Sequence, residues 1–369
     1  MTRDFQFMAQ ALRLAAKGRG TASPNPMVGA LVVKNGRVVG QGFHRRPGLP
    51  HAELLALRQA GDLARGATLY VTLEPCCHRR KRTPPCVPAV IGSAVRRVVI
   101  AMNDPNPSVN GRGVAALRRA GLAVTVGVGR REAEELNRAY SHWMRTKRPY
   151  VILKAGMTLD GKIATVTGQS RWITGRQSRR EVHRLRSEVD AVLIGVGTVL
   201  SDDPSLTART GPRLARLAPK QPLRVVVDSG LRIPPKARVL AHQEMAKTVV
   251  ATIHGADPAK RRALLRRGIE VLTLPRTGGQ VSLPALMNEL GRREVTSVLL
   301  EGGSELNAAM LKARLVQHVR FYIAPLLFGG NDTKNVIGGR GPARLASAFK
   351  LNNLSTRMVG GDLMIEGDL

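Results

Sequence analysis

The sequence predicts an α/β protein of two domains, a three-layer α/β/α sandwich followed by a doubly wound, mainly parallel sheet. Both halves of the 369-residue chain alternate short apolar, β-branched runs with stretches of helical spacing. Between the halves, the polar and basic stretch 144–149 ends on Pro149 and is typical of a linker. We therefore expect domains at residues 1–146 and 147–369.

The first domain is expected to begin with a helix and a hairpin. Asp4 can cap a helix whose apolar positions repeat at helical spacing from Phe5 to Ala15. Asn35-Gly36 lies between two apolar runs, which is a strong hairpin signal. A helix should start at His51, directly after Pro50. Further strands are predicted at Thr68–Leu73, Val95–Met102 and Leu122–Val128.

The second domain is expected to contain a series of buried strands. Amphipathic stretches at 178–187 and 304–315 lie between strand-like runs, which favours a parallel sheet with helices on its faces. The predicted strands are Tyr150–Ala155, Ala191–Val196, Leu223–Asp228, Thr248–Thr252, Glu270–Leu274, Ser297–Glu301 and Arg320–Ala324.

The composition favours a cytoplasmic enzyme. Three cysteines do not make a disulfide framework, and neither a signal-peptide pattern nor a membrane-length apolar run is present. The net charge of +32 is spread over the chain, with 25 Lys and Arg against 8 Asp and Glu in residues 1–149 and 33 against 18 in the rest. This excess predicts nonspecific attraction to nucleic acid but no dedicated nucleic-acid partner, since only 3% of the residues are aromatic and able to stack on bases.

The most informative motif is His51-Ala-Glu53 followed by Pro75-Cys76 and Pro85-Cys86. One imidazole and two thiolates can hold Zn²⁺ and leave a fourth position for water, whose pKa the metal lowers. The order H-x-E…P-C…C is typical of zinc nucleobase deaminases, in which the glutamate carries protons and does not bind the metal. Glu53 is therefore the candidate acid/base, and His51, Cys76 and Cys86 are the candidate ligands.

Cys77 and His78 are competing candidates for the two ligand places beside His51. Nine residues separate Cys76 from Cys86, so the motif is not the compact C-x-x-C. Two adjacent cysteines rarely reach one metal ion together, and a lone cysteine is usually a buried packing residue. We therefore expect Cys77 to pack and not to bind zinc.

Several further motifs carry a family resemblance. The segment 73–86, with Thr21–Ala30, Gly42-Phe43-His44, Asp104–Pro107 and Gly111-Arg-Gly113, resembles the deaminase half of the bifunctional deaminase/reductase family of riboflavin biosynthesis. Lys154–Lys162, Ser170–Thr174 and Gly197–Arg209 resemble its reductase half. The loop between Cys76 and Cys86 has one residue more than the family pattern, lacks its glycine, and carries Cys77 in place of serine.

The resemblance implies a cytidine-deaminase-like first domain and a dihydrofolate-reductase-like second domain. It implies zinc-dependent hydrolytic deamination of a diaminohydroxy-phosphoribosylaminopyrimidine. NADPH-dependent reduction of the ribosyl group to ribityl phosphate would follow. Zn²⁺ and NADPH are the implied cofactors, the phosphorylated pyrimidine is the implied partner, and a homo-oligomer with no membrane partner is expected.

The resemblance also assigns residues. In the deaminase half, the substrate positions are Asn25, His44, Arg82, Asp104 and Asn106, with Arg82 open to a shift of one residue because of the longer loop. In the reductase half, the substrate positions are Lys154, Ser170, Arg186, Leu206, Arg209 and Glu301. The cofactor positions are Gly156, Trp172, Thr198, Asp202, Ser229 and Gly303.

The sequence admits two other interpretations. The high positive charge is compatible with a nucleic-acid or nucleoside deaminase that carries a basic domain. It is also compatible with a non-enzymatic RNA-binding protein that holds a structural zinc. The reductase-like second half argues against the first, and Glu53 argues against the second because a structural site does not need it.

Overall fold

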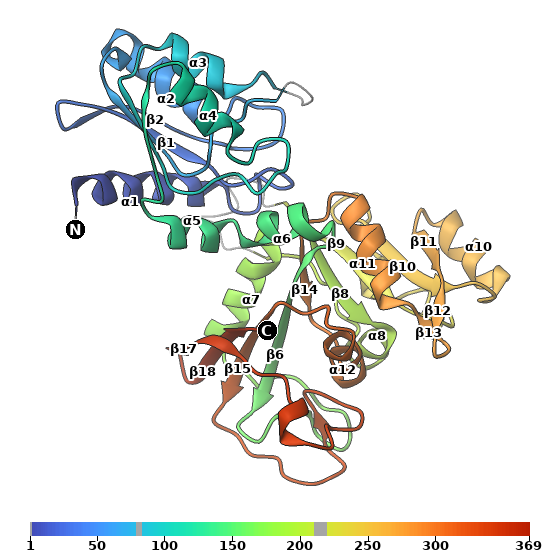
Figure 1. Ribbon diagram of the computed structural model, residues 1–369. Helices are drawn as coiled ribbons and strands as arrows, with labels where there is room; N and C mark the ends of the chain where they lie inside the picture. The colour runs from blue at the N-terminus through green and yellow to red at the C-terminus, as the bar shows by residue number, and fades with distance from the viewer. Residues whose placement is uncertain (1, 79–82, 210–219) are drawn as a thin grey trace. The chain divides into compact units, whose positions relative to one another are not determined.

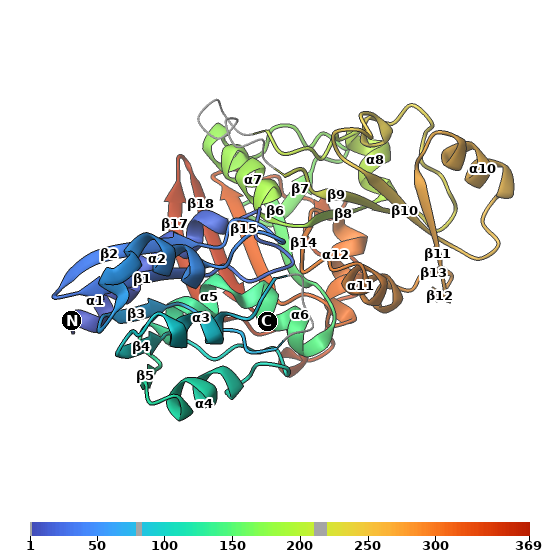
Figure 2. The same cartoon turned by 90° about the horizontal axis from the view of Figure 1, so that it is seen from above.

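The computed structural model describes residues 2–78, 83–209 and 220–369. The chain divides into two compact units, Met1–Lys147 and Arg148–Leu369. Figures 1 and 2 show that both units contain a sheet with helices packed on it. In the described ranges no helix combines the length and the apolar character that crossing a membrane requires.

Unit 1 is the expected three-layer sandwich. Among its described residues, a five-stranded sheet has the order β2-β1-β3-β4-β5. Strand β1 is antiparallel to both β2 and β3, and β3, β4 and β5 are parallel. Helices α1 and α5 cover one face, and α2, α3 and α4 cover the other (Figure 1). The elements are α1 (Arg3–Ala15), β1 (Gly29–Lys34), β2 (Arg37–Phe43), α2 (Ala52–Ala60), β3 (Thr68–Val71), α3 (Cys86–Gly92), β4 (Arg97–Ile100), α4 (Arg112–Arg119), β5 (Ala123–Val126), α5 (Arg130–Leu136) and α6 (Arg138–Thr146).

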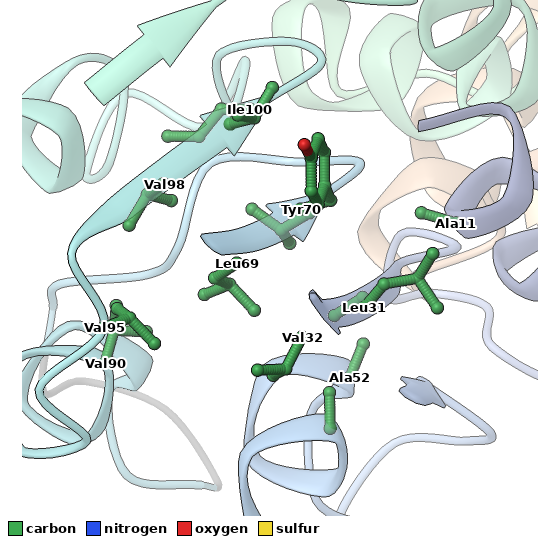
Figure 3. Packing of buried hydrophobic residues seen from close by; sticks show 14 of the residues in the cluster. Ala11, Leu31, Val32, Ala52, Leu69, Tyr70, Val90, Val95, Val98 and Ile100 are labelled. Atoms are coloured by element: carbon green, nitrogen blue, oxygen red, sulfur yellow. The ribbon is translucent and has the colours of Figure 1, made fainter. Parts of the chain in front are cut away.

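Side chains of β1 alternate between the two helix layers that cover the sheet of this unit. Leu31 and Val32 are both buried, and because neighbours on a strand point to opposite faces they enter different halves of the core. Figure 3 shows Leu31 on the side of Ala11 of α1 and Val32 on the side of Ala52 of α2. The strand is therefore apolar on both faces, which is why it appears in the sequence as a continuous hydrophobic run.

The expected role of Asp4 is wrong. Thr2 occupies the N-cap position of α1, and the Asp4 carboxylate instead accepts hydrogen bonds from Tyr70 (2.7 Å) and from Arg97 (2.7 and 3.0 Å). A bidentate guanidinium is a stronger partner than a backbone N–H group. Asp4 therefore ties α1 to strands β3 and β4.

The predicted hairpin is confirmed. Asn35 and Gly36 connect β1 to β2 with φ values of 50° and 76°, the left-handed conformation that a tight two-residue turn requires. The next glycines, Gly40 and Gly42, let α2 approach β2 closely. A Cβ atom at Gly40 would lie 2.1 Å from the Ala56 carbonyl oxygen, and one at Gly42 would lie 2.5 Å from that of Ala52.

Unit 2 contains a nine-stranded sheet in the described part of the chain. Its order is β11-β10-β9-β8-β14-β6-β15-β18-β17, and the strands from β11 to β15 are all parallel. All seven predicted strands are confirmed. They are β6 (Tyr150–Thr158), β8 (Ala191–Gly195), β9 (Leu223–Val227), β10 (Thr248–Ile253), β11 (Glu270–Leu274), β14 (Ser297–Leu300) and β15 (His318–Ala324).

The helices of unit 2 follow the parallel strands, as expected for a doubly wound sheet. The predicted amphipathic stretches form α7 and α12, each close to its expected bounds. The helices are α7 (Arg176–Glu188), α8 (Val196–Asp202), α10 (Pro258–Arg266), α11 (Leu283–Arg292) and α12 (Ser304–Lys312). Short strands also occur at β7 (Lys162–Ala164), β12 (Arg276–Thr277), β13 (Gln280–Val281) and β16 (Lys334–Asn335).

Two features differ from the sequence-based expectation. A hairpin of β17 (Asn352–Val359) and β18 (Asp362–Asp368) extends the sheet with two antiparallel strands that the sequence did not predict. The stretch expected to be a linker is also partly helical, because α6 continues through Thr146 and ends at Lys147 with a φ of 59°.

Candidate active sites

The ends of two elements bring the candidate zinc ligands of unit 1 together. His51 is the N-cap residue of α2, and Cys86 is the first residue of α3. Cys76 lies in the loop after β3, and its carbonyl oxygen and Sγ both accept the backbone N–H of Cys86, at 3.0 and 3.3 Å. The two cysteines are therefore adjacent in space although nine residues separate them in the sequence.

The donor atoms converge as a metal site requires. The Nδ1 atom of His51 lies 3.6 Å from the Cys76 Sγ and 3.2 Å from the Cys86 Sγ. All three ligand atoms lie within 4.8 Å of one another, and both cysteines are buried. One nitrogen and two sulfur donors at these separations fit Zn²⁺ with one position left for water.

The remaining nitrogen of His51 has a partner of its own. Its Nε2 atom lies 2.9 Å from the Thr83 hydroxyl oxygen, so the hydroxyl can fix the orientation of the ring. Cys77 is half-buried, and its Sγ lies 4.0 Å from the Ser108 carbonyl oxygen. Burial is the main cause that raises the pKa of the Cys77 thiol, and Glu74 adds to the effect. A protonated thiol is a poor metal ligand.

Glu53 lies in the first turn of α2 and is 3% exposed. Burial raises the pKa of its carboxyl group, the charge of Cys76 raises it further, and His51 opposes the shift. A buried carboxyl group with a raised pKa, next to the ligand cluster, is suited to accept and release protons.

Asn25 and His44 lie next to the ligand cluster. The Asn25 Nδ2 is 2.9 Å from the His44 Nε2, and the His44 Nδ1 is 3.4 Å from the Pro50 carbonyl oxygen. The rings of His44 and His51 meet edge to face with centroids 5.2 Å apart. When the Asn25 amide donates to Nε2, the Nδ1–H of His44 can donate to the Pro50 carbonyl oxygen.

Asp104 and Asn106 lie in the loop after β4. The Asp104 Oδ1 accepts hydrogen bonds from the Tyr140 hydroxyl and from the Asn106 N–H, both at 2.9 Å. Burial raises the pKa of Asp104 to about 6. The Asn106 side-chain oxygen accepts the Ser108 N–H at 3.0 Å, which shapes the turn. Arg82, the remaining deaminase substrate position, lies outside the described residues.

The loop around Asp104 is organised by a buried carboxylate, Glu74. Its two oxygens accept the backbone N–H groups of Asp104 (3.1 Å), Gly111 (2.9 Å) and Val114 (3.0 Å). Position 113 requires glycine, because a Cβ atom there would lie 2.2 Å from the Pro75 carbonyl oxygen. Glu74 thus links the cysteine loop to the loop after β4.

In unit 2, Glu301 is the centre of a buried ion-pair cluster. It directly follows β14, and its two carboxylate oxygens face Nε (2.6 Å) and Nη2 (3.0 Å) of Arg186 from α7. The Lys154 ammonium of the neighbouring strand β6 lies 3.4 Å from the Glu301 Oε2. Burial would raise the pKa of Glu301, but Arg186 and Lys154 outweigh it and lower the pKa to about 2.

Arg209 and Leu206 lie in the segment after α8. The Arg209 N–H faces the His183 Nδ1 at 3.4 Å, and the Arg186 Nη1 donates to the Thr207 carbonyl oxygen at 3.3 Å. Burial, with the charges of Arg186 and Arg209, lowers the pKa of His183 to about 4. The side chain of Leu206 is buried in the core, and its φ is 56°.

Ser170, Asp202 and Trp172 form a second group. The Ser170 hydroxyl donates to the Asp202 Oδ1 at 2.8 Å, and the Arg171 guanidinium contacts the Asp202 carbonyl oxygen. Trp172 is 67% exposed, and the Arg179 guanidinium lies over its ring at 4.4 Å from the centroid. Trp172 is therefore not a core residue.

The remaining cofactor candidates lie on or beyond parallel strands. Thr198 follows β8 and Gly303 follows β14, the adjacent strand; a Cβ atom at Gly303 would lie 3.4 Å from the Thr198 hydroxyl oxygen. Gly156 lies in β6, where a Cβ atom would be 3.0 Å from the Thr174 methyl group. Ser229 lies just beyond β9, and its hydroxyl donates to the Gln280 side chain at 2.8 Å.

Sequence reasoning missed several residues that organise the sites. Tyr140, Asn137 and His183 lie outside the sequence motifs, whereas Thr83 lies inside the segment 73–86. Glu74 lies inside the quoted segment 73–86, and its position before Pro75-Cys76 was a signal that could have drawn attention to it.

Two family models match the chain on either side of the boundary between the units. Residues 1–102 match the cytidine and deoxycytidylate deaminase zinc-binding region. Residues 149–365 match the RibD C-terminal domain. The first match contains His51, Cys76 and Cys86, and the second contains Lys154, Arg186 and Glu301.

Whole-chain relatives show both halves together. The riboflavin biosynthesis protein RibD of Aquifex aeolicus is 43% identical over 362 residues, which cover 98% of this chain and 97% of the relative. The Escherichia coli RibD is 42% identical over 369 residues, with 98% of each chain covered.

Solved structures agree over the same length. Acinetobacter baumannii RibD has a TM-score of 0.89 at 35% identity and covers 99% of this chain and 98% of its own. The diaminohydroxyphosphoribosylaminopyrimidine deaminase/5-amino-6-(5-phosphoribosylamino)uracil reductase of Thermotoga maritima has a TM-score of 0.86 at 36% identity, with the same coverage.

Proposed function

Since the chain belongs to the RibD family of bifunctional riboflavin-biosynthesis enzymes, which join a deaminase to a reductase, we propose which residues carry each activity. Unit 1 would remove the amino group of a diaminohydroxy-phosphoribosylaminopyrimidine. Unit 2 would reduce the ribosyl group of the aminouracil product to a ribityl phosphate chain. The observation that carries the first assignment is the cluster of His51, Cys76 and Cys86 beside the buried Glu53.

In the deaminase, His51, Cys76 and Cys86 would hold Zn²⁺. The ion would lower the pKa of a water molecule toward neutrality and so make it a nucleophile. Glu53 would accept the proton of the attacking water on a carboxylate oxygen and pass it to the pyrimidine ring nitrogen. A second transfer through Glu53 would protonate the amino group, which leaves as ammonia.

The neighbouring side chains would bind the substrate. Asn25 and His44 would contact the pyrimidine, since their hydrogen bond holds the Asn25 amide and the His44 ring beside the ligand cluster. Asp104 and Asn106 would accept hydrogen bonds from the ring or the ribose. Arg82 would approach the phosphate. The pKa of Asp104, raised to about 6 by burial, makes this contact sensitive to pH near neutrality.

In the reductase, Lys154, Arg186 and Arg209 would provide positive charge for the phosphorylated substrate, and Glu301 would hold the first two in place. Support comes from the ion pairs of Glu301 with Lys154 and Arg186. Ser170 and the backbone of Leu206 would complete the pocket. NADPH would supply the hydride that reduces the ribosyl C1, and the residues would orient that carbon toward the nicotinamide.

NADPH itself would bind at the carboxyl edge of the parallel sheet. The turns after β8 and β14 leave room for backbone N–H groups to approach phosphate. A Cβ atom at Gly197 would meet nothing within 4 Å, and one at Gly303 would meet the Thr198 hydroxyl oxygen at 3.4 Å. Thr198 and Gly303 would contact the pyrophosphate, and Gly156, Trp172, Asp202 and Ser229 would contact the rest of the cofactor. We also propose a cytoplasmic location and a homo-oligomer.

A nucleic-acid deaminase with an appended basic domain is not favoured. The RibD C-terminal model covers residues 149–365, so the second half is a reductase and not an accessory basic region. RibD relatives also match over nearly the whole chain.

The assignment can be tested with the purified chain and the pyrimidine substrate. NADPH oxidation should depend on prior release of ammonia, and a zinc chelator should abolish both signals from the diamino substrate. With the deaminated intermediate supplied directly, NADPH oxidation should continue in the presence of the chelator. Chelator-resistant ammonia release would overturn the zinc assignment.

A further inference from the structure

We propose that Asn137 and Tyr140 are positioning residues of the deaminase pocket, through which one helix, α6, holds the two loops that carry Asn25 and Asp104. The inference rests on the proposed function of unit 1. Both residues are buried, at 1% and 7% exposure, and neither is expected to touch the substrate or the metal.

Asn137 fixes the first loop. It stands at the N-cap of α6, and its side-chain amide binds the backbone of Met27 in both directions. The Asn137 Oδ1 accepts the Met27 N–H at 2.8 Å, and its Nδ2 donates to the Met27 carbonyl oxygen at 3.0 Å. Two opposed hydrogen bonds to one residue define both the position and the direction of the chain there.

The effect reaches Asn25 because the connection is short and stiff. Only Pro26 separates Met27 from Asn25, and the proline ring fixes one of the two backbone dihedral angles of that link. Asn25 in turn bonds His44, whose ring packs against the ring of the ligand His51. A displaced Met27 would therefore move the pyrimidine-binding amide relative to the metal site.

Tyr140 fixes the second loop. It lies three positions after Asn137, about one turn along the chain, and its hydroxyl donates to the Asp104 Oδ1 at 2.9 Å. The Asn106 N–H occupies the same oxygen, while in the described contacts no hydrogen bond reaches the Asp104 Oδ2. The tyrosine thus holds the carboxylate in the orientation that leaves Oδ2 for substrate.

The two contacts together make α6 a spacer between the loops. The zinc-binding region recognised in the family model ends at residue 102, so both positioning residues lie beyond it. The helix therefore adds a structural requirement to the pocket that the zinc motif does not contain. Loss of either side chain should leave the metal site intact but let one substrate-binding loop move.

Tyr140→Phe is the decisive variant because it removes one hydroxyl and keeps the packing. We expect the KM of deamination to rise about tenfold, the effect of losing one hydrogen bond to a charged group, with kcat changed less than about threefold. Zinc content should stay stoichiometric, and reduction of the deaminated intermediate should be unchanged.

Tyr70→Phe is the matched control. Tyr70 is another buried tyrosine of the same unit whose hydroxyl donates to an aspartate, Asp4, at 2.7 Å. Asp4 is not a pocket residue, so this variant should lose comparable stability without the rise in KM. An equal rise in KM in both variants, or in neither, would overturn the positioning role.

Hydrogen exchange of the intact chain gives a second readout that does not depend on activity. Exchange of the amides in loop 103–110 should increase in Tyr140→Phe, and that of Met27 should increase in Asn137→Ala; Tyr70→Phe should change neither. Unchanged exchange in both α6 variants would overturn the inference. A wild-type chain that fails to deaminate the pyrimidine would overturn the proposed function instead, while the exchange comparison would still decide the role of α6.

Discussion

The guanidinium of Arg186 and the carboxylate of Glu301 meet in two parallel contacts, Nε to Oε1 at 2.6 Å and Nη2 to Oε2 at 3.0 Å. The pair joins α7 to the end of β14, and its side chains are only 12% and 9% exposed. A planar fork can make both contacts at once, whereas an ammonium group cannot. The pair therefore fixes a direction as well as a charge at the proposed reductase site.

Arg186→Lys should consequently lower the kcat/KM of the reductase by about tenfold to a hundredfold, because one of two charge-assisted hydrogen bonds is lost in a buried site. The deaminase of the same preparation should be unaffected. Steady-state NADPH oxidation with the deaminated intermediate measures the first effect, and ammonia release measures the second. Full reductase activity in Arg186→Lys would show that the fork geometry is unimportant.

The same pair makes stability depend on pH. The pKa of Glu301 is lowered from 4.5 to about 2, so its contribution is complete above pH 4.5 and is lost as the pH falls toward 2. The ionised Glu301 carboxylate contributes about 3 kcal/mol to the free energy of unfolding. Calorimetry from pH 6 to pH 3 should show that the unfolding transition of unit 2 falls more steeply in the wild type than in Glu301→Gln. Parallel curves would contradict the ion-pair assignment.

Glu53→Gln should retain stoichiometric zinc, because the amide is nearly isosteric with the carboxylate. Deamination should fall by about 10²–10⁴-fold, because an amide cannot accept and release a proton as the carboxylate does. Reduction of the deaminated intermediate should continue at the wild-type rate. Metal analysis together with the two activity assays separates these outcomes. Loss of zinc in this variant would mean that Glu53 is a ligand.

Among the cysteines, Cys76→Ser and Cys86→Ser should each abolish stoichiometric zinc, and Cys77→Ser should not. The Sγ atoms of Cys76 and Cys86 converge with the His51 Nδ1, whereas that of Cys77 faces the Ser108 carbonyl oxygen. Elemental analysis of the three purified variants decides the matter. Zinc lost from Cys77→Ser but kept by Cys76→Ser would place the ligand one residue later.

The two units should function as separate fragments, 1–147 and 148–369, because each has its own hydrophobic core. The first should bind zinc and deaminate. The second should reduce the intermediate with NADPH preferred over NADH, and the preference should weaken as salt screens the extra phosphate. Hydride transfer by the first fragment, or a preference for NADH, would contradict the division.

The sequence was most informative where local pattern and burial agree. The seven parallel strands of unit 2 were predicted because strands buried on both faces form apolar runs bounded by turns. The hairpin β17–β18 was missed because β17 is exposed at all but one of its positions, so no apolar run marks it. The cap assigned to Asp4 failed because partners from β3 and β4, distant in sequence, bind it instead.

The site residues, too, could be predicted only where a local sequence pattern marks them. The metal cluster was predictable because its ligands stand in a recognisable order with fixed neighbours. Asn137 and Tyr140 were not, since their side chains bind residues 110 and 36 positions away. In the described contacts, the Asn137 side chain bonds to the backbone of Met27 alone. A contact to backbone requires nothing of the partner's side chain and therefore leaves no pattern in the sequence.

Because Gly40 and Gly42 have no side chains, α2 can pack close to β2. This close packing sets the distance of His51 and Glu53, at the start of α2, from the sheet. A single methyl group at Gly42 would push the helix outward as a rigid rod. Both residues would retreat together from Cys76 and Cys86, which are anchored on other elements. A screen for loss of function would then report Gly42 as an active-site position, although it is not among the residues proposed to bind metal or substrate. The geometry of the proposed metal site therefore depends partly on the lack of side chains at two positions of β2, which contributes no ligand.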